Sequence, residues 1–126
     1  MKMAKTGLVV VASHYESGGQ RAQELVDAAA LSLQAKGIQP VMGAKTIWDA
    51  ADGIDVCAQL REQEVDSLTV VLSTWVTDSL LYVLVQQMQV PVVFWAVPYT
   101  ETFSIGCVQH FGSILKTHGI PYDYVY

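Results

Sequence analysis

Short aliphatic runs alternate with longer amphipathic segments along the whole chain. The first run, Gly-Leu-Val-Val-Val-Ala at 7–12, is apolar without interruption. Uninterrupted apolar runs of this length are typical of strands buried on both faces of a parallel sheet. The pattern predicts strands at 7–12, 38–42, 68–72, 90–95 and 122–126.

Between these strands, apolar residues recur at the spacing of an amphipathic helix. The second predicted helix is expected to bury Ile54, Cys57 and Ala58. Asp78 or Ser79 is expected to cap the third, because both types accept hydrogen bonds from free helix N–H groups. Helices are predicted at 20–36, 52–64, 79–88 and 104–118.

The strict alternation of strands and helices predicts the α/β class, with a three-layer, doubly wound, parallel five-stranded sheet. Right-handed crossovers favour the flavodoxin-like strand order 2-1-3-4-5. The 126 residues suit a single domain, so 1–126 is expected to form one flavodoxin-like domain. The chain stops at its last predicted strand, and we expect it to be the N-terminal part of a longer chain. The alternative is a short protein whose last strand lies at the sheet edge.

Charge and cysteine content narrow the possible partners. The 7 Lys and Arg residues are scattered and the net charge is −5, so nucleic acid is not an expected partner. Only 15% of residues are charged. This low fraction indicates either a surface that contacts other protein or an ordinary soluble domain with few surface charges. Cys57 and Cys107 lack disulfide or zinc spacing, which suits a reducing cytoplasm. No apolar run approaches the about 20 residues that span a membrane.

Candidate chemistry gathers in three predicted loops, 14–19, 73–78 and 96–103. Open parallel sheets bind ligands at the carboxyl ends of their strands, where these loops converge. Aromatic rings beside carboxylates and amides suit sugars, because a ring stacks on the C–H face while hydroxyl groups need polar partners. For each aromatic ring, the alternative is packing at a strand end. For His14, the alternative is an ordinary polar position in a loop. The candidate substrate-binding residues are His14, Tyr15, Glu16, Trp75, Glu101, Phe103 and Gln109.

Motifs for several other chemistries are absent from the sequence. It contains no HExxH, GxSxG or Walker A pattern. The first loop holds Ser and Gly, but Glu16 within it would repel phosphate, so flavin or nucleotide is not expected. No catalytic residue, metal ligand or cofactor is therefore predicted within these residues.

Two stretches resemble the N-terminal region of the L-fucose/L-arabinose isomerase-like family. Leu-Ser-Thr-Trp-Val-Thr-Asp-Ser at 72–79 is followed by Pro-Val-Val-Phe-Trp-Ala-Val-Pro at 91–98. Glu-Thr-Phe-Ser at 101–104 then opens the helix that leads to 119–126. The combination of TW…D with WA.P…ETFS is distinctive, and the resemblance spans essentially the whole chain.

This resemblance implies an oligomeric aldose–ketose isomerase of carbohydrate metabolism. Such enzymes use Mn²⁺ or a similar divalent ion to move a proton between neighbouring sugar carbons, with metal ligands and acid–base carboxylates in later domains. The chain is then expected to be inactive alone, and its partners to be the remaining domains, the sugar and further copies. The matching sugar-contact positions are His14 to Glu16 and Trp75, with Glu101 to Phe103 and Gln109 weaker. The alternatives are a stand-alone flavodoxin-like binding module for a small ligand or protein, and an interaction protein without a ligand.

Overall fold

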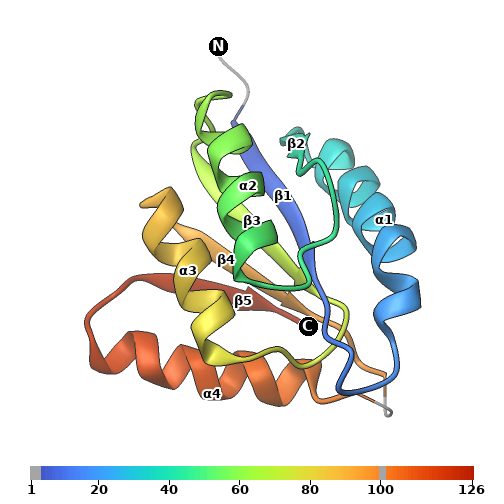
Figure 1. Cartoon of the computed structure of the whole chain (residues 1–126). Helices are drawn as coiled ribbons and strands as arrows, with labels where there is room; N and C mark the ends of the chain where they lie inside the picture. The colour runs from blue at the N-terminus through green and yellow to red at the C-terminus, as the bar shows by residue number, and fades with distance from the viewer. Residues whose placement is uncertain (1–3, 100–101) are drawn as a thin grey trace.

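A five-stranded parallel sheet organises the chain (Figure 1). The computed structural model describes residues 4–99 and 102–126. Its strands pair in the order β2-β1-β3-β4-β5, which confirms the predicted flavodoxin-like α/β fold. The strands are β1 (Lys5–Val11), β2 (Gln39–Met42), β3 (Ser67–Leu72), β4 (Val92–Ala96) and β5 (Tyr122–Val125).

The helices cover the two faces of the sheet unequally. The short 3₁₀ turn η1 (Gly19–Arg21) leads into α1 (Ala22–Ala35), which packs on one face; the other face meets α2 (Ala50–Arg61), α3 (Asp78–Met88) and α4 (Ser104–Thr117) (Figure 1). The larger core lies beneath these three helices, where Phe94 and Phe111 meet edge to face with centroids 5.8 Å apart. The smaller core lies between α1 and β1.

The cap of the third helix differs from the prediction. Thr77 holds the N-cap position, with extended backbone, and Asp78 is the first helical residue. The carboxylate of Asp78 therefore lies in the first turn, where it faces the positive end of the helix dipole. The predicted cap at Asp78 or Ser79 is wrong by one or two positions. Thr77, Asp78 and Ser79 follow one another, and each is a residue type that can cap a helix.

The buried face of α2 also differs from the prediction. Cys57 is buried as expected, but Ile54 is 47% exposed and Ala58 is exposed too. The cause is Gly53, which lets α2 approach α3 closely: a Cβ atom there would lie 3.2 Å from Leu84 Cδ2. The helix turns its glycine towards the neighbour and leaves Ile54 at the surface.

Both cysteines are buried free thiols. Burial raises the pKa of Cys57 and of Cys107 to about 11. Thiols with such a pKa stay protonated and unreactive at neutral pH. None of the helices in the described part of the chain is long and apolar enough to cross a membrane.

Candidate functional site

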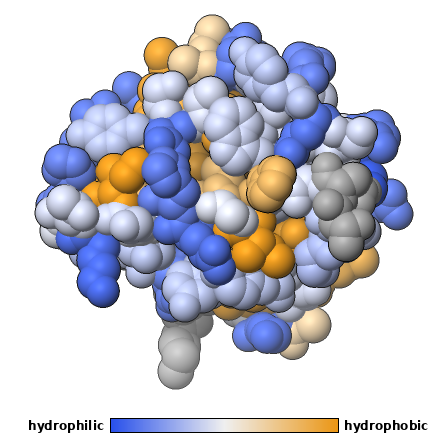
Figure 2. Space-filling view, turned by 90° about the horizontal axis from the view of Figure 1, so that it is seen from below, coloured by the Kyte–Doolittle hydropathy of each residue, from blue (hydrophilic) through white to orange (hydrophobic). Residues whose placement is uncertain are grey.

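Three loops meet at the carboxyl ends of the strands, as the sequence predicted. They connect β1 to η1 (12–18), β3 to α3 (73–77) and β4 to α4 (97–103). We call this side of the molecule the loop edge. Viewed from this side, apolar and weakly polar groups lie among hydrophilic ones (Figure 2). Segments distant in sequence are thus brought to one surface.

The carboxylate of Glu16 ties the three loops together. Its Oε1 atom accepts hydrogen bonds from the backbone N–H of Trp75 and from the hydroxyl of Thr102. The backbone N–H of Phe103 lies 3.2 Å from Oε1 and 3.3 Å from Oε2. A carboxylate that accepts several such bonds fixes its donors, because charge-assisted hydrogen bonds are the stronger ones. Glu16 is therefore a positioning residue for the loop edge.

Buried hydroxyl groups reinforce the same junction. Ser73 Oγ donates to the carbonyl oxygen of Gly18 at 2.5 Å, and Ser13 Oγ donates to the carbonyl oxygen of Trp75 at 2.8 Å. Thr74 Oγ1 accepts from the backbone N–H of Ser13 at 2.7 Å. Gly18 has a φ of 122°, and a Cβ atom there would lie 3.0 Å from the Ser73 carbonyl oxygen. Only glycine suits this close approach of the first and second loops.

The buried hydroxyl group of Ser104 holds the third loop in place. Its Oγ accepts from the backbone N–H of Val97 at 3.0 Å and donates to the carbonyl oxygen of Leu72 at 2.8 Å. Ser104 is fully buried. The end of β3, the end of β4 and the start of α4 are joined through this one side chain.

A pocket of about 410 Å³ opens between the tied loops, lined by Tyr15, Glu16, Trp75, Phe103 and Gly106. Tyr15 and Trp75 meet edge to face, with ring centroids 6.2 Å apart. Tyr15 is 82% exposed and Phe103 is 73% exposed, so both rings leave apolar surface open at the pocket. The structure thus brings together four of the predicted site residues.

The remaining predicted site residues lie elsewhere or outside the described part. His14 is exposed and stacks on the indole of Trp48, with centroids 4.3 Å apart and planes 3° from parallel. This stack borders a neighbouring hollow of about 220 Å³ that includes Trp48 and Tyr15. Gln109 is exposed on α4 and does not line the pocket. Glu101 falls outside the described residues.

Sequence reasoning missed several residues that shape the loop edge. Trp48 and Ser104 were not among the candidates, and neither was the exposed pair of His110 Nε2 and Asp78 Oδ2, 3.0 Å apart. The sequence does indicate the buried hydroxyl groups, since Ser and Thr follow directly after the predicted strands. It does not indicate their hydrogen-bond partners, because each hydrogen bond joins loops that are far apart in sequence.

The two backbone donors that border the pocket are already occupied. The N–H groups of Trp75 and Phe103 already bind the carboxylate of Glu16. Within 4–99 and 102–126, no three His, Cys, Asp or Glu side chains gather as a metal site. The residues described do not offer a ligand set for the Mn²⁺ that the resemblance implies, and no chemical step through a metal follows from them.

Comparison of the sequence with protein-family models and with curated proteins finds no match in either. Function must therefore be inferred from the geometry of the loop edge, together with the residues that resemble the isomerase-like family. The fold itself does not decide the matter, because flavodoxin-like sheets host many unrelated activities.

Proposed function

We propose that this chain is the N-terminal substrate-recognition and assembly domain of an aldose–ketose isomerase resembling L-fucose isomerase. In this proposal the aromatic pocket of the loop edge forms one wall of the sugar site. A single observation carries it: three aromatic rings border a pocket whose loops are held together by Glu16. The TW…D and WA.P…ETFS stretches supply two of the three loops.

The shape and lining of the pocket suit a monosaccharide. Its volume of about 410 Å³ lies within the usual range for small-molecule sites. Rings of Tyr15, Trp75 and Phe103 offer apolar faces to the C–H groups of a sugar. The carboxylate of Glu16 and the hydroxyl of Tyr15 lie in the same lining and can bind sugar hydroxyl groups.

Charge favours a neutral sugar over a phosphorylated one. A phosphate group in the pocket would face the carboxylate of Glu16. The backbone N–H groups of Trp75 and Phe103 already donate to that carboxylate and are not available to a phosphate. The free aldose or ketose is therefore the proposed ligand class.

Catalysis is assigned to polypeptide other than these residues. We expect no interconversion of L-fucose or L-arabinose with the corresponding ketose by this chain supplied with Mn²⁺. Isomerase activity from the chain alone would contradict the assignment. Binding, rather than turnover, is the property to measure.

The test is a titration of the ¹⁵N-labelled chain with L-fucose, L-arabinose and a sugar phosphate, followed by NMR. Amide signals of Tyr15, Trp75 and Phe103 are expected to shift with millimolar affinity for the neutral sugars, about −4 kcal/mol. The sugar phosphate is expected to bind at least about 10-fold more weakly, since like charges oppose it.

Two matched variants test whether the pocket binds the sugar. Trp75→Leu removes a ring from the lining and is expected to abolish the shifts. Tyr82→Leu removes an exposed ring on α3 that lies outside the pocket lining, and should leave them unchanged. If neutral sugars well above about 10 mM move no pocket signal, or move them equally in Trp75→Leu, the proposed site is wrong.

A further inference from the structure

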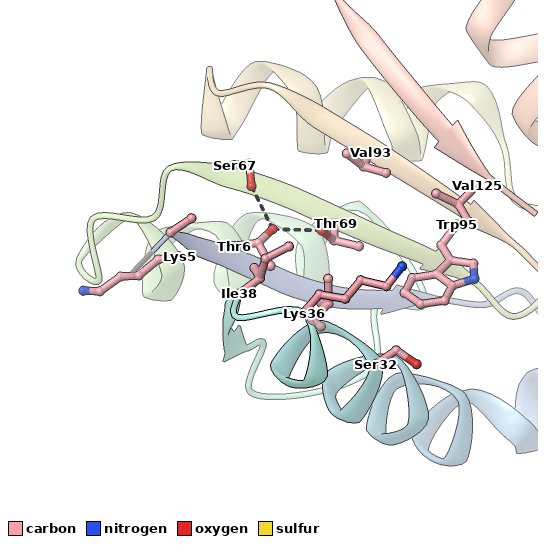
Figure 3. A pocket seen from close by; sticks show the side chains of 12 residues that line it. Lys5, Thr6, Ser32, Lys36, Ile38, Ser67, Thr69, Val93, Trp95 and Val125 are labelled. Carbon is pink, nitrogen blue, oxygen red and sulfur yellow. Dashed lines mark hydrogen bonds between the residues drawn. The ribbon is translucent and has the colours of Figure 1, made fainter. Parts of the chain in front are cut away.

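A second hollow lies beside α1, on the face of the sheet opposite α2, α3 and α4. Its volume is about 450 Å³, and side chains of α1, β1, β3, β4 and β5 border it (Figure 3). We call it the α1 pocket. Among the described residues, its lining shares no member with the pocket at the loop edge. The two pockets are therefore separate surfaces of the chain.

The walls of the α1 pocket are largely apolar and already in place. Leu33 and Ile38 line it on the side of α1, and Val93, Trp95 and Val125 line it from the sheet. Leu33 and Trp95 also pack against the smaller core between α1 and β1, which fixes both side chains. Val93 and Trp95 are half-buried, and Val125 is 44% exposed. Preformed apolar hollows of this size are the usual form of small-molecule sites.

Three linked hydroxyl groups add a polar strip to these walls. Ser67 Oγ donates to Thr6 Oγ1 at 2.9 Å, and Thr6 Oγ1 lies 2.8 Å from Thr69 Oγ1 (Figure 3). Thr6 and Thr69 are buried, and all three residues line the pocket. Because a hydroxyl oxygen can accept two hydrogen bonds and donate one, the strip keeps capacity for a polar group of a ligand.

The charged side chains of the lining are both cationic. Lys5 and Lys36 line the pocket, and no carboxylate side chain among the described residues does. Lys5 points away from the hollow, with its Nζ 3.4 Å from the carbonyl oxygen of Gln63, whereas Lys36 reaches across it towards Trp95 (Figure 3). Asp123 faces the same side of the sheet but lies outside the lining. In a chain of net charge −5, such a lining favours an anionic ligand.

We propose that the α1 pocket binds a small aromatic monocarboxylate. The ring of this ligand lies between Leu33 and the indole of Trp95, and its carboxylate pairs with the ammonium group of Lys36. An aromatic body gains a ring–ring contact with Trp95 that an aliphatic chain lacks. A lysine ammonium group is a single point charge, so it matches one carboxylate and leaves a dianion partly unpaired.

Titration of the ¹⁵N-labelled chain with 2-naphthoate, followed by NMR, tests this proposal. The indole N–H signal of Trp95 and the amide signal of Thr69 are expected to shift with a Kd of about 1 mM, as a ligand of this size allows. The indole signal of Trp75, at the loop edge, should not move. The neutral compound 2-naphthamide has nearly the same shape and is expected to bind about 10-fold more weakly, because it lacks the charge.

Paired variants separate the ion pair from the apolar contact. Lys36→Gln is expected to weaken 2-naphthoate binding about 10-fold and to leave 2-naphthamide binding unchanged. Lys116→Gln removes a cation from the last turn of α4, outside the lining, and should alter neither. Ser32→Trp fills the pocket from an exposed position on α1 and is expected to abolish binding of both compounds. Gln34→Trp, also exposed on α1 but outside the lining, should preserve it.

The proposal is overturned if 2-naphthoate at about 10 mM, well above the expected Kd, leaves the Trp95 signal in place. Equal affinity for the acid and the amide, or an unchanged preference in Lys36→Gln, would exclude the ion pair. Binding that survives Ser32→Trp would place the compound elsewhere. Circular dichroism checks that each variant is folded. Sugars are followed at Tyr15, Trp75 and Phe103, so failure at one pocket is distinguishable from failure at the other.

Discussion

Replacing Glu16 with alanine should loosen the loop edge while leaving the sheet intact. The variant removes the acceptor for the backbone N–H groups of Trp75 and Phe103 and for the Thr102 hydroxyl. A hydrogen bond to a charged group contributes roughly 1.5–3 kcal/mol. Because Glu16 is only half-buried, the lower value applies, and the two backbone donors together lose about 3 kcal/mol.

Hydrogen exchange measures this loss at the atoms concerned. An opening free energy lowered by about 3 kcal/mol accelerates amide exchange of Trp75 and Phe103 by about 100-fold. Glu16→Gln keeps a neutral acceptor, so its acceleration should be about 10-fold. Ser17→Ala, one position further along and exposed, serves as the control and should change neither amide.

Two results would refute the reasoning about Glu16. Unchanged exchange at Trp75 and Phe103 in Glu16→Ala would show that the carboxylate does not hold the loops. Equal acceleration at these amides and at Val70, in the centre of the sheet, would show a global rather than a local effect.

Two further predictions concern the first loop and the buried thiols. Gly18→Ala should lower the free energy of unfolding by roughly 2 kcal/mol in denaturant titrations, because φ is 122° and the new Cβ meets the Ser73 carbonyl. Gly106→Ala, in α4 with its nearest neighbour at 3.6 Å, should instead stabilise by about 0.5–1 kcal/mol; the reverse order would contradict the geometry. Burial holds the pKa of Cys57 and Cys107 at about 11 in the folded state, above their ordinary value. Stability is therefore unaffected at neutral pH and falls as pH rises from the unfolded pKa towards the folded one, by up to about 1.4 kcal/mol per unit for each thiol. The double variant Cys57→Ala/Cys107→Ala should lose this dependence, and a wild type with the same alkaline profile as the variant would disprove it.

The architecture could be predicted from the sequence because its signals are local. The aliphatic run of β1 and the helical spacing of α4 each follow from side chains that repeat within one element. The predictions failed where contact with a neighbouring element determines which side chains are buried. The exposure of Ile54 depends on Gly53 meeting Leu84, thirty-one positions later in the chain.

The candidate site was predictable only in part, for a similar reason. Tyr15, Trp75 and Phe103 could be assigned to one edge, because parallel strands end together. That Glu16 would bind loops 59 and 87 positions away could not be predicted, since a carboxylate in a loop has many possible donors. The same holds for His14, whose stacking on Trp48 depends on the conformation of two loops.

The ring of Tyr122 in the last strand rests on Gly112 of α4, where an added Cβ would lie 2.5 Å from its hydroxyl oxygen. A side chain at position 112 would therefore push the ring, and the edge strand that carries it, away from α4.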